Sequence, residues 1–366
     1  MKYLSEYRDA DVVAQYMDEI RRTATRPWTI MEICGGQTHS LVKNGLLQLL
    51  PENVRMVHGP GCPVCVTPLY KIDKAVHLAE EEGVILCSYG DMLRVPGSKR
   101  SLLESKAVGA DVRILYSPLE AVKIAQENPG KEVVFFAIGF ETTAPANALS
   151  LLHAQRAGVT NYSILTSHVL VPPAIEAVMN DEDSNIQGFL AAGHVCAIMG
   201  IDEYYPLAEQ YEIPIVVTGF EPVDLVQGIL MTVRQLEKGE HKLENQYSRI
   251  VRPEGNPEAR KVLEQVFEIG DREWRGIGNI PMSGYELKAE FSAYDANKKF
   301  KVNIEKVSES AECIAGLVLK GIKKPNECPQ FCKKCKPQSP LGAPMVSSEG
   351  ACAAYYHFSQ IMEEVA

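Results

Sequence analysis

The chain has 366 residues, of which 46% are hydrophobic and 23% are charged. This length and composition predict a folded protein of roughly two to three domains, and they exclude a disordered, collagenous or low-complexity chain. The formal net charge of -10 excludes a general electrostatic attraction for nucleic acid or for an anionic membrane.

The N-terminal residues lack the apolar stretch of a secretory signal, and no later run reaches the ~18 apolar residues of a membrane span. We therefore expect a cytoplasmic protein that does not cross a membrane. In such a reducing compartment, the ten cysteines are more often used for metal binding or redox chemistry than for structural disulfides.

Residues 27–130 alternate β-rich runs with helical patterns, which is typical of a parallel sheet covered by helices. The expected strands in both halves of the chain are 28–34, 54–59, 83–90, 111–117, 132–140, 162–168, 186–192 and 213–220. After about residue 240, charged segments rich in Gly or Pro replace the apolar strands. We predict an α/β fold with parallel-sheet lobes over residues 1–130 and 131–240, followed by an irregular domain over 241–366.

Chemically active side chains follow several of the expected strands directly. They are Cys34, Cys62, Cys65, Asp91, Glu141 and His168. Ligands of open parallel sheets bind beyond the carboxyl ends of the strands, near the point where the strand order reverses. We therefore expect the strand ends of the two lobes to face one another across a cleft.

The first motif is CGGQTH, from Cys34 to His39, at an expected strand-to-helix junction. Its glycines allow a tight turn or a close approach to a ligand, and a helix N-terminus favours the Cys34 thiolate. A soft thiolate with His39 nearby suits a transition metal. The motif alone also fits a glycine-rich turn with a buried cysteine and a surface histidine, so both interpretations stay open.

The second motif is GPGCPVCVTP, which places Cys62 and Cys65 three positions apart before an expected helix. Two thiols at this spacing can close into a disulfide, as in thioredoxin-type redox pairs. The motif lies deep in a larger α/β array than a thioredoxin domain. It indicates a redox or metal-binding role, with two structural cysteines as the alternative.

The third set of cysteines is C-terminal and comprises Cys328, Cys332, Cys335 and Cys352. Four thiolates in a Pro-, Lys- and Gly-rich segment suit an iron-sulfur cluster or a structural zinc. Because only Cys332 and Cys335 form a CxxC knuckle, the cluster is favoured. We interpret Cys87, Cys196 and Cys313 as buried small residues, and we leave open whether His168 and His194 are functional or structural.

Five segments occur in a recognisable order: CGGQTH, GPGCPVCVTP, SYGDMLRVPG, GFETTAP and MVSSEGACAAYY. Together they resemble the HypD family of NiFe-hydrogenase maturation factors. The resemblance implies two related α/β domains and a 4Fe-4S domain. It also implies a complex with the small protein HypC, on which an iron bearing two cyanides and one carbon monoxide is assembled. HypE would deliver each cyanide as a thiocyanate.

The resemblance also implies roles for individual residues. Cys34 would be a thiolate ligand of the assembling iron, and His39 would support that iron from the same loop. Cys62 and Cys65 would form the redox-active pair, with iron ligation as a competing assignment. We expect electrons to pass from an external reductant to the cluster, then to the pair and to the iron at Cys34.

One departure concerns the cluster ligands. Members of the family often read GAC before MVSSEGAC, whereas this chain reads Gly342-Ala343-Pro344 and lacks that cysteine. We predict that Cys332 replaces it. The alternatives to an assembly scaffold are a stand-alone thiol-disulfide reductase acting through Cys62 and Cys65, and a zinc-stabilised interaction protein without catalytic function.

Overall fold

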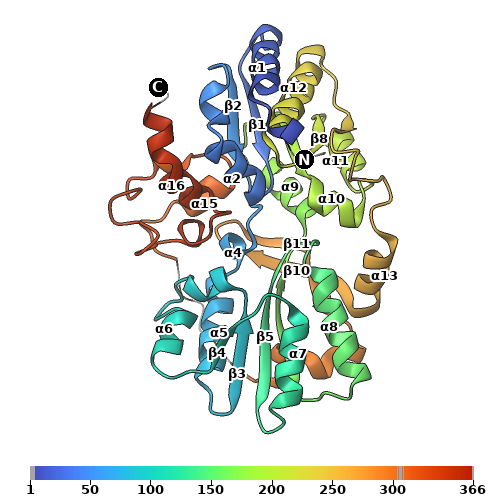
Figure 1. Cartoon of the computed structure of the whole chain (residues 1–366), viewed down its shortest axis with the longest axis vertical. Coiled ribbons are helices and arrows are strands. Elements are labelled where there is room, and N and C mark those ends of the chain that lie inside the picture. The colour runs from blue at the N-terminus through green and yellow to red at the C-terminus, as the bar shows by residue number, and fades with distance from the viewer. Residues whose placement is uncertain (1–4, 303, 305–306, 308, 365–366) are drawn as a thin grey trace.

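The structure is a computed structural model that describes residues 5–302, 304, 307 and 309–364. Two parallel sheets form an upper and a lower lobe, stacked along the long axis (Figure 1). The upper lobe has the strand order β2 (Val54–His58), β1 (Trp28–Glu32), β7 (Gly188–Ala192), β8 (Ile215–Thr218) and β9 (Leu243–Asn245). The lower lobe has the order β4 (Val112–Ile114), β3 (Val84–Ser88), β5 (Glu132–Gly139) and β6 (Tyr162–His168).

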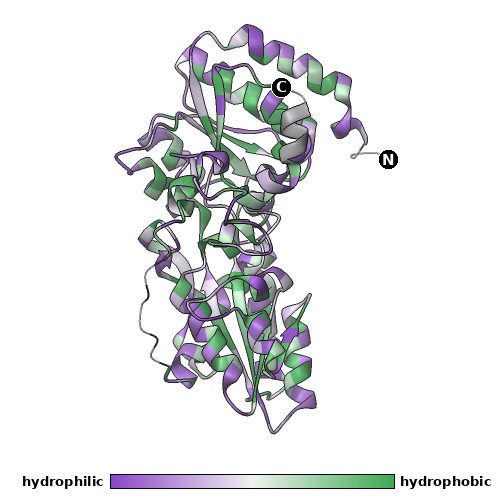
Figure 2. Cartoon of the chain, turned by 90° about the vertical axis from the view of Figure 1, so that its left-hand side faces the viewer, coloured by the Kyte–Doolittle hydropathy of each residue, from purple (hydrophilic) through white to green (hydrophobic). Residues whose placement is uncertain are grey.

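Every pairing in these two sheets is parallel, as the apolar runs predict. The strands are buried on both faces because helices cover them; all residues of β6 and β7, for example, are buried. Figure 2 shows the apolar strands inside both lobes and more hydrophilic helices outside. The predicted α/β class with two parallel-sheet lobes is confirmed.

The helices around the upper lobe are α1 (Ala10–Thr23), α2 (Gly35–Lys43), α3 (Leu46–Leu49), α9 (Val171–Met179), α10 (Gly193–Met199), α11 (Tyr204–Gln210) and α12 (Pro222–Lys238), with η1 (Ser5–Arg8) before them. Those around the lower lobe are α5 (Leu69–Glu80), η2 (Gly90–Arg94), α6 (Leu102–Ala107), α7 (Pro118–Glu127) and α8 (Ala144–Arg156). The helix α4 (Pro63–Val66) lies between the lobes (Figure 1).

The sequence predicted that the two lobes divide at residue 130, but the structure divides them differently. The chain enters the upper lobe with β1 and β2, builds the whole lower lobe from β3 to β6, and returns to the upper lobe with β7. The reason is that β1 pairs with β7, for example Met31 with Phe189, and this long-range pairing leaves no signal in local periodicity. Each lobe is therefore assembled from parts of both predicted domains.

The segment after residue 240 is also distributed over the molecule. β9 completes the upper sheet, and α13 (Pro257–Val266) packs against α8 of the lower lobe. An antiparallel hairpin of β10 (Phe267–Trp274) and β11 (Gly278–Leu287) lies between the lobes (Figure 1). The hairpin was not predicted, because charged residues interrupt the apolar alternation of β10, and Gly, Asn, Pro and Ser interrupt that of β11.

The rest of the C-terminal region contains short helices, namely η3 (Ala289–Tyr294), α14 (Ala296–Lys299), α15 (Ala315–Leu319), η4 (Pro325–Glu327) and η5 (Ala343–Met345), and ends in α16 (Ala351–Glu364). α16 packs against α2 beside the upper lobe (Figure 1). The predicted irregular domain over 241–366 is thus restricted to the part of this region that contains α15, η4, η5 and α16.

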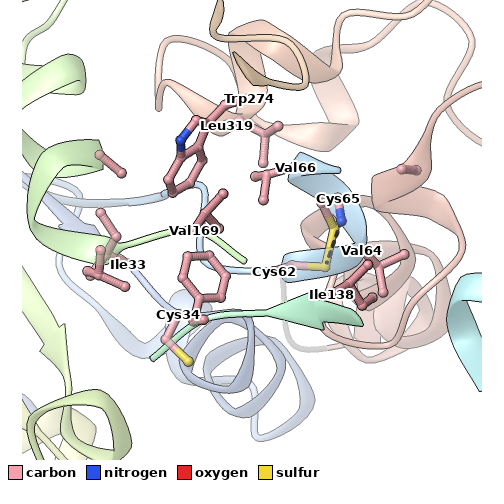
Figure 3. Close-up of a cluster of buried hydrophobic side chains, with 14 of the residues drawn as sticks. Ile33, Cys34, Cys62, Val64, Cys65, Val66, Ile138, Val169, Trp274 and Leu319 are labelled. Carbon is pink, nitrogen blue, oxygen red and sulfur yellow. Dashed lines mark hydrogen bonds between the residues drawn. A yellow bond between two sulfur atoms is a disulfide. The ribbon is translucent and has the colours of Figure 1, made fainter. Parts of the chain in front are cut away.

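A single buried hydrophobic cluster joins the two lobes where their strand ends face one another. It contains Ile33 after β1, Ile138 at the end of β5, and Val169 after β6 (Figure 3). The hairpin contributes Trp274, and α15 contributes Leu319. Packed side chains therefore fill the space between these strand ends, and Cys34, Cys62 and Cys65 lie among them.

Candidate functional site

Cys34 lies at the switch point of the upper sheet. The connection after β1 leads to β2 on one side, whereas the connection after β7 leads to β8 on the other side. Open parallel sheets commonly bind their ligands at such a reversal, beyond the two central strands. Cys34 follows β1 by two residues, is the N-cap of α2, and has a buried side chain. Its backbone N–H donates to Oε2 of Glu32 over 3.0 Å, which fixes the turn.

His194 lies beside Cys34 from the other central strand. It is the second residue of α10, which begins where β7 ends. Its ring nitrogens Nδ1 and Nε2 are 3.9 and 3.8 Å from the Cys34 sulfur. The ring is held edge-on against Phe220, with 5.0 Å between the ring centroids. Cys34 and His194 thus form a sulfur and nitrogen donor pair across the switch point.

Burial keeps both members of this pair uncharged in the free protein. It lowers the pKa of His194 to about 4. It raises the pKa of the Cys34 thiol, and the nearby Glu349 carboxyl raises that pKa further. The effect of burial therefore outweighs the helix N-terminus that was expected to favour a Cys34 thiolate. A thiol and a neutral imidazole can still ligate a metal cation, because binding displaces the thiol proton.

His39 points toward the C-terminal region. Its Nδ1 lies 3.1 Å from the carbonyl oxygen of Ser348, and its ring packs edge-on against Phe358 of α16. These contacts attach α2 to α16. The role of His39 in supporting the iron stays a prediction, whereas His194 occupies the place next to the Cys34 sulfur.

A buried hydrogen-bond network connects the Cys34 loop with α16. The carboxylate of Glu32 accepts hydrogen bonds from the Thr38 hydroxyl and, over 2.6 Å, from Nδ1 of His58. On its other side, Nε2 of His58 is 2.9 Å from the Tyr355 hydroxyl. The network joins β1, β2, α2 and α16, so hydrogen bonds connect the Cys34 loop directly with the C-terminal helix.

Cys62 and Cys65 form a disulfide, with Cα atoms 5.2 Å apart (Figure 3). Cys62 is the N-cap of α4, and its sulfur accepts a hydrogen bond from the backbone N–H of Cys65 over 3.3 Å. Their exposures are only 3% and 1%, which excludes direct attack by a large external thiol in this state. A disulfide provides no thiolate ligand, so iron ligation by this pair stays a prediction that requires the reduced form.

Gly61 places the disulfide loop against the Cys34 loop. The Gly35 backbone N–H donates to the Gly61 carbonyl oxygen over 3.1 Å. A Cβ atom on Gly61 would lie 2.2 Å from the carbonyl oxygen of Ile33 and 2.5 Å from the backbone nitrogen of Cys34. Only glycine allows the two loops to approach this closely.

Replacing Gly61 by alanine should therefore destabilise the protein by about 1–3 kcal/mol, as expected for overpacking against rigid backbone. Thermal or denaturant unfolding measures this change. Gly130→Ala is the matched control, because a Cβ atom there meets nothing within 4 Å. If both variants unfold like the unchanged protein, the close approach of these loops is wrong.

Four cysteines line a small pocket in the C-terminal region. They are Cys313, Cys328, Cys335 and Cys352. The rest of the lining is mainly apolar and includes Pro344 and Met345 of η5. Because α4 packs against η5, the disulfide and this pocket share a neighbouring element. The structure thus brings Cys328, Cys335 and Cys352 together, as predicted for cluster ligands.

The remaining cysteines differ from one another in their surroundings. Cys332 is exposed and does not line this pocket. Cys87 and Cys196 are fully buried, which confirms their interpretation as core residues. Cys313 is only partly buried and lies in the pocket wall, so its interpretation as a buried small residue is wrong.

The other predicted strand-end residues have different surroundings. Asp91 lies close enough to Glu349 to raise the pKa of that carboxyl, after the larger effect of burial. Glu141 is buried and accepts a hydrogen bond from the Val171 backbone N–H over 2.8 Å. His168 is buried in the lower lobe, with Nε2 2.6 Å from the Asn147 amide nitrogen.

Among the residues that the structure describes, no group of three or more His, Cys, Asp or Glu side chains is arranged to hold a metal ion. The ligands of a 4Fe-4S cluster each bind a different iron atom and stand farther apart than the ligands of one ion. Within the described ranges, no helix has the length and apolar character needed to cross a membrane.

Comparison with known proteins identifies the family. The sequence model of HypD, described as the hydrogenase formation hypA family, matches residues 11–359. The chain belongs to the HypD family. This confirms the resemblance found in the sequence.

The HypD relatives match over nearly their whole length. The hydrogenase maturation factor HypD of Azotobacter vinelandii is 46% identical over 374 residues, covering 100% of this chain and 99% of the relative. The protein of the same name from Escherichia coli is 46% identical over 368 residues, covering 98% and 99%. The one from Rhodobacter capsulatus is 46% identical over 370 residues, covering 98% of both chains.

Four of the five motifs that indicated the HypD family are joined by contacts near Cys34. A Cβ atom on Gly35 of CGGQTH would lie 2.4 Å from the carbonyl oxygen of Glu349 in MVSSEGACAAYY. Arg94 of SYGDMLRVPG donates to the Val346 carbonyl oxygen over 3.2 Å. The disulfide loop of GPGCPVCVTP packs on the same turn through Gly61. These HypD motifs are distant in sequence but form one continuous site.

Proposed function

We propose that this chain is a redox-capable scaffold on which the cyanide- and carbon monoxide-bearing iron of a NiFe hydrogenase is assembled. Membership of the HypD family and the names of its relatives support hydrogenase maturation as the general function. The observation that carries the finer proposal is the Cys34 and His194 donor pair at a sheet switch point, beside the buried Cys62–Cys65 disulfide.

The iron is the cargo of this scaffold. The Cys34 sulfur binds it as thiolate after losing its proton, and the neutral His194 imidazole is close enough to contribute a second donor or to accept that proton. Soft sulfur and strong-field cyanide and carbon monoxide suit low-spin Fe(II). A HypC-like partner supplies a further thiolate, and a HypE-like protein supplies cyanide.

The disulfide accounts for the electron balance of cyanide release. When a thiocyanate breaks its S–C bond, two electrons are needed, because the sulfur leaves as thiolate and cyanide leaves with the carbon lone pair. The reduced Cys62 and Cys65 supply these two electrons, lose two protons and form the S–S bond. Before the next cyanide, two electrons and two protons must reopen that bond.

The cysteine pocket fits the 4Fe-4S cluster that this function requires. Three of the predicted ligands, Cys328, Cys335 and Cys352, line one small and mainly apolar pocket. A cluster bound there supplies electrons one at a time from an external low-potential donor. The shared element η5 places the disulfide next to the region that would hold it.

His194→Ala should weaken iron binding by about 10- to 100-fold, the range found when a residue that tunes a metal site is removed. His194→Gln keeps a polar group of similar reach and should lose less. Titration of the partner-free chain with Fe(II) under anaerobic conditions measures both affinities. Equal affinities for the unchanged protein and His194→Ala would remove His194 from the site.

Metal analysis of protein purified without oxygen, after co-expression with its maturation partners, tests the proposal. We expect iron in excess of acid-labile sulfide, because cargo iron adds to the cluster. Stoichiometric zinc without iron would favour a zinc-stabilised interaction protein. Iron and sulfide in equal amounts, together with reduction of protein disulfides, would favour a stand-alone reductase. The burial of Cys62 and Cys65 counts against that reductase.

A further inference from the structure

A buried glutamine next to Cys34 joins three strand ends around the proposed iron site. We propose that the Gln37 side chain is a positioning residue, which sets the distance between the Cys34 sulfur and the His194 ring. This role rests on the proposed function, in which the Cys34 and His194 pair holds the cargo iron. Neither the CGGQTH pattern nor the mechanism above assigns a role to Gln37.

Gln37 belongs to the same helical turn as Cys34. It is the third residue of α2, and its backbone N–H donates to the Cys34 carbonyl oxygen over 2.9 Å. Its side chain is completely buried. A shift of the Gln37 side chain is therefore passed on to the turn that carries the Cys34 sulfur.

The side-chain amide of Gln37 donates to the next two strands of the sheet, β7 and β8. Its Nε2 donates to the Ala191 carbonyl oxygen of β7 over 3.2 Å and to the Thr218 hydroxyl at the end of β8 over 2.6 Å. Because a carbonyl oxygen only accepts hydrogen bonds, the contact with Ala191 requires the amide nitrogen at this place. One buried group thus connects α2 with both strands.

The two acceptors of this amide lie close to His194 along the chain and in space. Ala191 precedes His194 by three residues, where β7 leads into α10. A Cβ atom on Gly193 would lie 2.4 Å from the Thr218 carbonyl oxygen, so Thr218 packs directly against the residue before His194. The contacts of Gln37 therefore hold the start of α10 at a fixed distance from α2.

The amide oxygen of Gln37 separates positioning from simple stabilisation. This oxygen, Oε1, is buried and has no hydrogen-bond partner among the residues that the structure describes. An unpaired buried polar atom costs about 1–3 kcal/mol of stability. Stability alone would favour an apolar side chain of this size, whereas positioning requires the amide nitrogen.

The spacing of the donor pair matters because metal–ligand bonds are short. Zinc, for example, binds sulfur at ~2.3 Å and imidazole nitrogen at ~2.0 Å, which places two such ligands of a tetrahedral ion about 3.5 Å apart. The Cys34 sulfur and His194 Nε2 are 3.8 Å apart without a metal, so the pair is close to a binding geometry. Residues that orient metal ligands typically contribute about 10- to 100-fold to metal affinity.

Gln37→Met tests the positioning role in the metal-free protein, because it removes the donor but keeps a side chain of similar length. In its crystal structure, the 3.8 Å separation of the Cys34 sulfur and His194 should widen by more than ~0.5 Å, the tolerance of a preorganised site. Gln235→Met is the matched control and should leave the separation unchanged. Gln235 is also buried in the upper lobe, but its amide joins α12 to Glu244 of β9.

Anaerobic titration of the cluster-loaded chain with Fe(II) measures the effect on the iron site, with Cys34→Ala as the blank. Gln37→Met should bind Fe(II) about 10-fold more weakly than the unchanged protein, and Gln235→Met should bind it equally well. Combining Gln37→Met with His194→Ala should add little to the loss caused by His194→Ala alone, because Gln37 acts through His194. A merely structural defect would add in full.

An unchanged separation in Gln37→Met, or full additivity of its loss with that of His194→Ala, would overturn the role of Gln37. If Gln37→Met does not fold, Thr218→Val removes the hydroxyl acceptor at little change of shape and is judged by the same two results. A widened separation, with equal Fe(II) binding by the unchanged protein and Cys34→Ala, would instead refute the iron site and keep the positioning. The two failures are therefore distinguishable.

Discussion

Cys62→Ser and Cys65→Ser should each abolish hydrogenase maturation while leaving the iron and sulfide of the cluster unchanged. A single thiol cannot form the intramolecular disulfide that releases two electrons to the thiocyanate. The cluster pocket is formed by other cysteines, so it should remain loaded. Hydrogenase activity in cells that carry each variant measures maturation, and metal analysis of the purified variant measures the cluster.

Cys196→Ser is a matched control for these variants. Cys196 is buried, but it lies in α10 outside the disulfide and the cysteine pocket. We expect maturation at the level of the unchanged protein. Full maturation with Cys62→Ser or Cys65→Ser would remove the dithiol from the mechanism.

Cys34→Ala should remove the cargo iron but leave the cluster intact. The variant lacks the thiolate at the switch point, and a lone neutral imidazole at His194 is a weak site for Fe(II). We expect iron affinity to fall by at least ~10-fold and maturation to stop. Anaerobic Fe(II) titration and the ratio of iron to sulfide measure the two metal sites separately.

His39→Ala distinguishes the two histidines associated with Cys34. Its ring contacts Phe358 and the Ser348 carbonyl oxygen, so its loss should loosen α16 and lower thermal stability. A loss of iron affinity as large as that of His194→Ala would place His39 at the metal after all. An unchanged affinity would leave it a structural contact.

The fold class could be predicted from sequence because continuous apolar runs identify buried parallel strands. The run of β5, for example, is buried over almost its whole length. The domain boundaries could not be predicted, since they depend on the pairing of β1 with β7. The hairpin of β10 and β11 was also missed, because charged residues in β10 and Gly, Asn, Pro and Ser in β11 hide the alternation.

The candidate site was predictable only where a single motif contains it. CGGQTH and GPGCPVCVTP identify Cys34, Cys62 and Cys65 without a structure. His194 required the structure, because its contact with Cys34 joins two strands whose adjacency is not encoded locally. The only available signal was its place directly after an apolar strand. The place of Cys313 in the wall of the cysteine pocket also required the structure, because Cys313 lies outside the closely spaced set Cys328, Cys332 and Cys335.

The presence of the iron at Cys34 is tested most directly by infrared spectroscopy of the complex formed with the maturation partners. The unchanged protein should show the stretching bands of iron-bound cyanide and carbon monoxide. The same preparation of Cys34→Ala, with its 4Fe-4S cluster confirmed by iron and sulfide analysis, should lack them. Bands of full intensity in Cys34→Ala would show that another residue holds the iron.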